Sequence, residues 1–162
     1  MRLRHSLSLA FRKKLKCIIL IDKRIKHPPL FMANIIQREV FIMEYKRFGN
    51  TIYLRLDPKE EILEEIGKVA KKENIRLAQV TGLGAINDFT AGVYNTVTKE
   101  YHSIQFQGAF EIVSLTGTVT RKDGDVYLHL HIAAGDEKGH VHGGHLNRAI
   151  ISATAEIQIQ VI

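Results

Sequence analysis

Apolar and polar residues alternate between Asn50 and Leu56, which predicts a half-buried β-strand. After this strand the apolar residues return every three or four positions, which predicts an amphipathic helix of about four turns that ends near Glu73-Asn74. The apolar positions of the helix are Ile62, Leu63, Ile66, Val69 and Ala70. The segment between strand and helix is typical of a helix start, with an N-cap, a first-turn proline and a glutamate that closes a capping box. These residues are Asp57, Pro58 and Glu60.

From Ile75 onward the pattern is almost entirely that of β-strands. Short turn segments rich in Gly, Asn and Asp separate the strands, as they do in hairpins and meanders. The predicted strands cover residues 76–83, 89–95, 103–120, 126–133 and 149–162, and the long third one breaks at Gly108. We therefore expect an α+β fold, a mostly antiparallel sheet with one main helix packed on it.

The composition is that of a globular domain, since 45% of the 162 residues are hydrophobic and 25% are charged. No apolar stretch approaches the roughly 20 residues that span a bilayer, so we expect no membrane partner and a cytoplasmic location. The single cysteine, Cys17, excludes an internal disulfide and a zinc site built from several thiolates. Any metal would have to be held by histidines or carboxylates.

The net charge of +6 comes from the first quarter of the chain. Residues 1–42 hold ten Lys and Arg against two acids, whereas residues 43–162 hold 13 against 15. This basic N-terminal extension could contact nucleic acid or an acidic membrane surface, or serve as a targeting peptide. We favour a disordered leader that need not belong to the native protein, because Met43 opens a stretch that reads as a complete domain, residues 43–162.

Five of the eight histidines lie within residues 129–145. His129 and His131 are two apart on a predicted strand, so both imidazoles point to the same face. A third metal ligand has three candidates, which are His140, His142 and His145. Gly143-Gly144 would let the backbone pass close to a site without a Cβ clash. Three histidine ligands leave a fourth position for water or substrate, as in catalytic zinc sites. The alternative is that His129 and His131 are hydrogen-bonded core or interface residues.

Two carboxylates on predicted strands are candidates for a catalytic role, Glu111 and Glu156. Such a group could orient a ligand histidine, move a proton beside a metal, or pair with a neighbouring subunit. We favour the structural pairing, because buried carboxylates usually have partners. Tyr94 and Tyr101 are interpreted as strand-packing residues rather than stacking platforms for bases.

Several segments, in a fixed order, resemble a known family, the PPC domain (plants and prokaryotes conserved). They are Val80–Ala85, Phe110–Gly117, His129-Leu130-His131, Gly143–Leu146 and Ala155-Glu156. The resemblance runs from about Met43 to Ile162. It implies an α+β fold assembled as a homotrimer. In prokaryotic members it also implies a metal, commonly zinc, and the ligands would be His129, His131 and His145.

The order of the histidine motifs is also similar to that of the zinc site of acetolactate decarboxylase, a related fold. That activity is not implied, because the loop between Ile132 and Gly143 is longer here and the whole domain is shorter. Plant members carry an Arg-Gly-Arg-Pro segment that enters the minor groove of DNA, and this chain has none. The label DNA-binding protein is nevertheless often attached to prokaryotic relatives. His140 and His142 have no counterpart in the family pattern.

The leading hypothesis is a metal-binding, trimeric PPC-type domain with a three-histidine site of unknown substrate and a regulatory role. One alternative is a DNA-binding protein that uses the basic N-terminal extension, the one part of the chain basic enough for the task. Another is a zinc-dependent lyase or hydrolase that acts on a small carbonyl substrate. A third is a structural trimer that depends on its metal.

Overall fold

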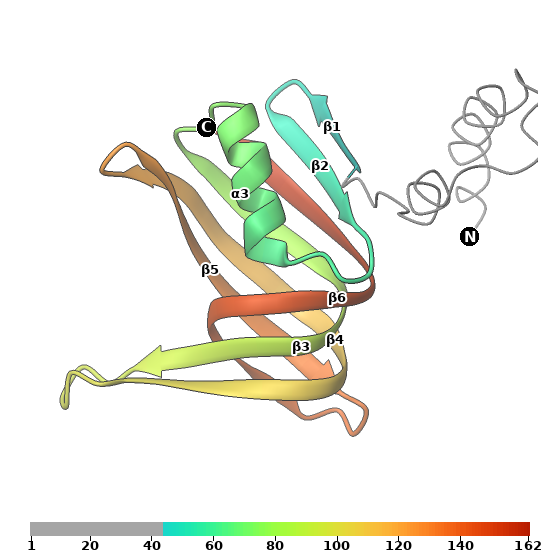
Figure 1. Cartoon of the computed structure of the whole chain (residues 1–162), viewed down its shortest axis with the longest axis vertical. Coiled ribbons are helices and arrows are strands. Elements are labelled where there is room, and N and C mark those ends of the chain that lie inside the picture. The colour runs from blue at the N-terminus through green and yellow to red at the C-terminus, as the bar shows by residue number, and fades with distance from the viewer. Residues whose placement is uncertain (1–43) are drawn as a thin grey trace, which may run out of the picture. The chain divides into compact units, whose positions relative to one another are not determined.

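The computed structural model describes residues 44–162, so the predictions made for residues 1–42 lie outside the described residues. One helix and six strands make up this part of the chain (Figure 1). They are β1 (Glu44–Phe48), β2 (Thr51–Leu56), α3 (Ile62–Lys72), β3 (Ala78–Tyr94), β4 (Tyr101–Lys122), β5 (Asp125–Asp136) and β6 (Val141–Val161). Every strand pairing is antiparallel, which confirms the expected fold class. Among the described residues, no helix has both the length and the apolar character needed to cross a bilayer.

The six strands form one sheet in the order β1-β2-β6-β3-β4-β5. The last strand in this order, β5, also pairs with β6, so β6, β3, β4 and β5 form a closed ring. This closure requires β6 to change direction along its length, as Figure 1 shows. Its first residues pair with β5 and its last ones with β2. The two ends of β6 therefore lie beside different strands, β5 at the first end and β2 at the last.

The strands are longer and fewer than the sequence pattern predicts. The two segments predicted over residues 76–83 and 89–95 are a single strand, β3. The predicted break at Gly108 is wrong, because β4 runs through it. Near this glycine the pairing shifts by one residue, from Ile86 opposite Phe110 to Asp88 opposite Gln107. Gly108, with φ of 138°, thus lies in a bulge that re-aims the strand without ending it.

The ends of the sheet also differ from the prediction. The final strand begins at Val141 and not at 149, since its first residues pair with β5. Strand β1 was not predicted at all. Four of its five residues are exposed, so the strand does not have one buried face. The alternation of apolar and polar residues that marks a half-buried strand is therefore not expected in it. It lies at the edge of the sheet and pairs only with β2.

Helix α3 buries its apolar face against the sheet, as its spacing predicts. Ile62, Ile66 and Val69 are fully buried in the core. The helix begins later than expected, because Glu61 and not Asp57 is the N-cap. The side chain of Glu61 accepts a hydrogen bond from the backbone N–H of Glu64 at 2.7 Å. Lys59, with φ of 79°, is incompatible with a helix and separates the two candidate caps.

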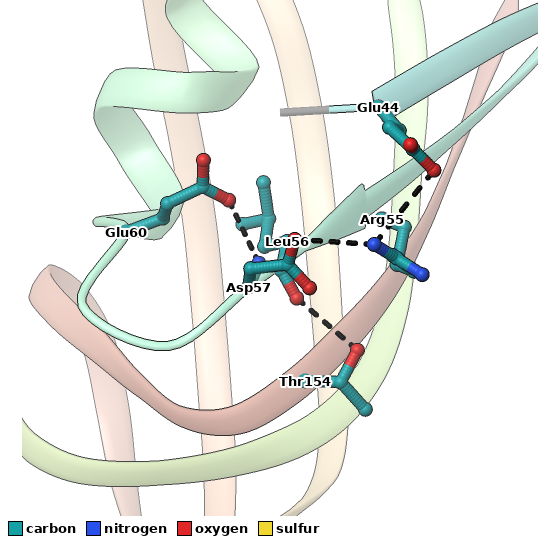
Figure 2. A network of polar contacts seen from close by, with 6 residues as sticks. All are labelled: Glu44, Arg55, Leu56, Asp57, Glu60 and Thr154. Carbon is teal, nitrogen blue, oxygen red and sulfur yellow. Dashed lines mark hydrogen bonds and ion pairs between the residues drawn. The ribbon is translucent and has the colours of Figure 1, made fainter. Parts of the chain in front are cut away.

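A polar network holds the corner between β2 and α3 (Figure 2). The carboxylate of Glu60 accepts a hydrogen bond from the backbone N–H of Asp57 at 2.8 Å. This is one of the two hydrogen bonds of the predicted capping box, and here it closes a turn that precedes the helix. Arg55 forms an ion pair with Asp57 at 3.1 Å and lies 3.7 Å from Glu44 of β1. On the other side, the hydroxyl of Thr154 donates to the carbonyl of Leu56 at 3.1 Å. The corner is therefore fixed to β1 and to β6 at once.

Replacing Gly67 by alanine should stabilise the domain. Gly67 lies inside α3, and a Cβ built there meets only Leu128 Cδ1, at an ordinary contact distance of 4.0 Å. Alanine loses less conformational entropy in a helix, so the free energy of unfolding should rise by about 0.5–1 kcal/mol. Urea denaturation of the two proteins measures this difference. An unchanged or lower midpoint would contradict the packing described here.

Candidate metal centre

Three histidines meet on one face where β5 and β6 pair. The register places His131 directly opposite His145, and His129 follows on the same face of β5, two residues away. The alternate residues of β5 turn to the other face, where Leu130 and Ile132 are buried in the core. The expected division of this strand into a histidine face and an apolar face is thus present. Of the three candidates for the third position, the register brings His145 beside the pair, whereas His140 and His142 lie beside Asp136.

The three imidazoles lie close enough to share one ion. Each offers a ring nitrogen, and these atoms all lie within 4.8 Å of one another. The ring centroids are 5.3 Å apart for His129 and His131, 5.1 Å for His129 and His145, and 5.5 Å for His131 and His145. A tetrahedral metal with bonds of about 2.0–2.1 Å holds its nitrogens about 3.4 Å apart, so small side-chain rotations suffice. Within residues 44–162 no other group of three His, Cys, Asp or Glu meets this geometry. The set fits zinc, whose preferred ligands include imidazole nitrogen.

The surroundings of the cluster favour neutral imidazole at His145. Burial lowers the pKa of this histidine, and the neighbouring His129 and His131 lower it further. Both causes disfavour the protonated ring, because charge is costly away from water and beside other cations. A neutral ring keeps the nitrogen lone pair that a metal ligand needs. The same contacts that gather the rings therefore keep one of them ready to bind.

This lowered pKa predicts how the metal-free protein titrates. The His145 resonance in an NMR titration of chelator-treated protein should have its midpoint below the ordinary value of 6.5. Because the folded state resists protonation more than the unfolded state, this group stabilises the fold above about pH 6.5. That contribution disappears as the pH falls through the folded value. A midpoint at or above 6.5 would contradict the crowding of the three rings.

A cavity of about 470 Å³ opens over the three rings. Its lining, here called the histidine pocket, consists of Gly92, Val93, Tyr94, Tyr101, His129, His131, Gly144 and His145. The tyrosines are therefore part of the pocket wall rather than only strand-packing residues. Tyr94 lies opposite Tyr101 in the β3–β4 ladder, and both side chains are partly exposed. The turn between β3 and β4, over residues 95–100, sets 94 against 101.

Tyr101 reaches across the sheet because Gly92 leaves space for it. A Cβ at Gly92 would lie 2.3 Å from the hydroxyl oxygen of Tyr101. The hydroxyl donates to Asn147 Oδ1 of β6 at 2.8 Å, which fixes the ring. The ring lies edge-on to His145, with centroids 6.3 Å apart. Gly92 has no chemical group that marks it as functional, so sequence reasoning missed it.

Gly143 and Gly144 permit close approach, but to neighbouring strands. A Cβ at Gly143 would lie 2.1 Å from the carbonyl oxygen of Ile132 in β5. One at Gly144 would lie 2.6 Å from the carbonyl oxygen of Gly92 in β3. The two glycines thus let β6 fit between β5 and β3. That fit closes the ring of strands beside the site.

The remaining candidates do not join the three rings within one chain. Glu111 is exposed and pairs across strands with Gly135. Glu156 is exposed and pairs with Arg55, near the β2 end of β6. Neither carboxylate lines the histidine pocket. Within one chain, the alternative role of these carboxylates beside a metal thus has no contact to support it.

His140 and His142 turn toward Asp136 in the β5–β6 turn. Their ring nitrogens lie 3.3 and 3.6 Å from the same Asp136 oxygen. Two backbone N–H groups, those of Lys138 and His140, also donate to this carboxylate. The ring of His142 packs on Phe106 with centroids 4.9 Å apart. These two histidines thus stabilise the turn.

A second hollow, of about 520 Å³, lies at the far end of β4 and holds none of this chemistry. It is lined by Asn74, Arg76, Thr120, Arg121 and Gly124. The guanidinium of Arg121 is already used, because it donates to the carbonyl of Ile75 at 2.9 Å.

Several solved structures share this fold. A protein of Bacteroides thetaiotaomicron, described as a candidate DNA-binding protein, is 31% identical with a TM-score of 0.71, over 74% of this chain and 83% of that one. A plant- and prokaryote-conserved (PPC) protein of Pyrococcus horikoshii is 35% identical with a TM-score of 0.65, over 74% and 81% of the two chains. A metal-containing protein of Archaeoglobus fulgidus is 29% identical with a TM-score of 0.65, over 74% and 84%.

A more distant structure, from Staphylococcus aureus, is described as similar to alpha-acetolactate decarboxylase. It is 13% identical with a TM-score of 0.52, over 72% of this chain and 54% of that one, so the likeness concerns the fold alone. No curated protein matches the chain. The sequence profile of the Plants and Prokaryotes Conserved (PCC) domain matches residues 43–162, the same stretch in which the ordered motifs resemble PPC proteins. The chain belongs to the Plants and Prokaryotes Conserved domain family.

Proposed function

We propose that this protein is a cytoplasmic, homotrimeric metal-binding domain that holds one divalent transition metal, most simply zinc, on His129, His131 and His145. The observation that carries the proposal is the convergence of three ring nitrogens within 4.8 Å at the floor of an open pocket. The relative from Archaeoglobus fulgidus, described as metal-containing, supports it. The role is binding or regulation.

Three protein ligands would leave one position of a tetrahedral metal open to water or substrate, and the three histidines line the histidine pocket. A metal bound there would polarise a carbonyl group or activate water. The chain's own contribution is to orient the rings, since the β5–β6 ladder fixes their backbones and Tyr101 packs edge-on to His145. No carboxylate lines the pocket, so a lyase or hydrolase would need Glu111 or Glu156 of another copy as its proton carrier.

Elemental analysis of protein purified without an affinity tag or added metal tests the proposal. The wild type should contain about one metal per chain, and His129→Ala should contain almost none, because two imidazoles bind far more weakly than three. His140→Ala is the matched control and should keep its metal, since that ring faces Asp136. A metal content that survives in His129→Ala would refute the site. Sedimentation of the same samples measures the mass of the assembly and tests the trimer.

DNA binding is the second candidate, and the relative from Bacteroides thetaiotaomicron favours it. The charge distribution confines this function to the basic extension, because residues 43–162 hold 13 basic and 15 acidic residues. Deleting residues 1–42 should therefore abolish salt-dependent binding to duplex DNA. Binding that persists with its salt dependence intact would assign DNA recognition to the domain itself.

A further inference from the structure

The histidine pocket has an unbalanced charge once a metal is bound. Three neutral imidazoles leave a divalent ion with its full charge of about +2. None of the residues that line the pocket is an acid. Glu100, the acid next to Tyr101, lies outside the lining, with its carboxylate 3.5 Å from His102 Nε2. A ligand that completes the coordination is therefore favoured if it is an anion.

The walls of the pocket indicate what the rest of that ligand resembles. Tyr94 and Tyr101 contribute aromatic rings, and the two lining glycines, Gly92 and Gly144, add no side chain. The hydroxyl of Tyr101 already donates its hydrogen to Asn147 Oδ1. The lining contains no Lys or Arg, the side chains that usually bind the several oxygens of a phosphate. The volume of about 470 Å³ leaves space for a small organic body beyond the coordinating group.

We propose that the histidine pocket binds a small organic carboxylate, with its anionic group at the metal and its apolar body against Tyr94 and Tyr101. This inference rests on the proposed function, because it is the metal that selects the charge. It adds a class of ligand to the metal site proposed above.

Cobalt(II) is a suitable probe, since imidazole sites accept it and its visible absorption reports the coordinated ligands. The full chain is loaded with cobalt(II) and titrated with benzoate, with its neutral isostere benzamide, with acetate and with inorganic phosphate. Benzoate should change the visible bands in a saturable way. Acetate, which lacks the apolar body, should bind about tenfold more weakly or worse, and benzamide, which lacks the charge, should do the same.

Substitutions of Tyr94 separate the effect of charge from that of shape. Its side chain is 52% exposed, so polar replacements should not disturb the fold. Tyr94→Gln removes the ring and should weaken benzoate binding, and Tyr94→Glu, which also adds a carboxylate, should weaken it about tenfold further by offsetting the metal's charge. Tyr53→Glu is the matched control, because this tyrosine is also 52% exposed and lies outside the pocket. It should leave benzoate binding unchanged.

Each outcome bears on one of the two proposals or on both. If cobalt(II) gives no tetrahedral bands that depend on His129, the metal site and the ligand class fail together. If the bands form but benzoate does not alter them, the metal site stands and the carboxylate is refuted. Benzamide or phosphate binding as tightly as benzoate would also refute it. Equal binding by Tyr94→Glu and Tyr94→Gln would show that the pocket does not select by charge.

Discussion

Replacing Gly117 by alanine should destabilise the domain by about 3 kcal/mol or more, enough to unfold much of it. Gly117 lies in β4 between the residues that pair with His131 and His129. A Cβ there would lie 2.0 Å from the carbonyl oxygen of His129 and 2.7 Å from Leu130 Cα. Both are backbone atoms, so relief requires β4 and β5 to separate. Urea denaturation measures the loss.

Gly67→Ala serves as the control for this experiment, because it adds the same methyl group at a position with open space. The two substitutions should shift the unfolding midpoint in opposite directions. If Gly117→Ala were as stable as the wild type, the close approach of β4 to β5 would be wrong. The positions of His129 and His131 would then be in doubt as well, because β5 is held there by its pairing with β4.

Zinc should stabilise the folded domain strongly. At a free zinc concentration one hundred times the dissociation constant, the free energy of unfolding should rise by about 2.7 kcal/mol, because the metal binds the folded state alone. His131→Ala should show almost none of this gain. His131 lies on β5 directly opposite His145 on β6, so the substitution removes one of the three rings where the two strands pair. Denaturation with and without a chelator measures the difference.

His140→Ala again provides the matched control, since it removes an exposed imidazole outside the cluster. It should gain as much stability from zinc as the wild type. Equal gains in His131→Ala would place the metal elsewhere. If the protein sediments as the proposed trimer, dissociation of His131→Ala without zinc, and of the wild type with chelator, would instead favour a structural role for the metal.

The local parts of the fold could be predicted because their signals are local. The spacing of Ile62, Ile66 and Val69 defines α3, and alternation defines β2 and the last part of β6. The spacing of the histidines left His140, His142 and His145 open as the third member of the cluster, because it does not fix the register of β5 against β6. The resemblance to PPC proteins pointed to His145, the residue that lies opposite His131.

Other features depend on contacts between distant segments. The alternation of apolar and polar residues does not reveal that β5 also pairs with β6. The pattern therefore predicts a final strand that is shorter than β6. The importance of Gly92 follows from a tyrosine on another strand that leans across it. Asp57 looked like a helix cap because the sequence does not reveal the left-handed conformation of Lys59. In each case a tertiary contact overrode a local preference.

The single long strand β6 has a consequence for how the domain assembles. It pairs with β2 across a sequence separation of 109 residues, as the contact between Thr51 and Gln160 illustrates, and with β3 in between. Such distant pairings raise the contact order, and chains of high contact order fold slowly because long loops must close first. His131 and His145, by contrast, lie on the two sides of one hairpin. This local pairing can form early, so the three rings gather before the last part of β6 docks on β2.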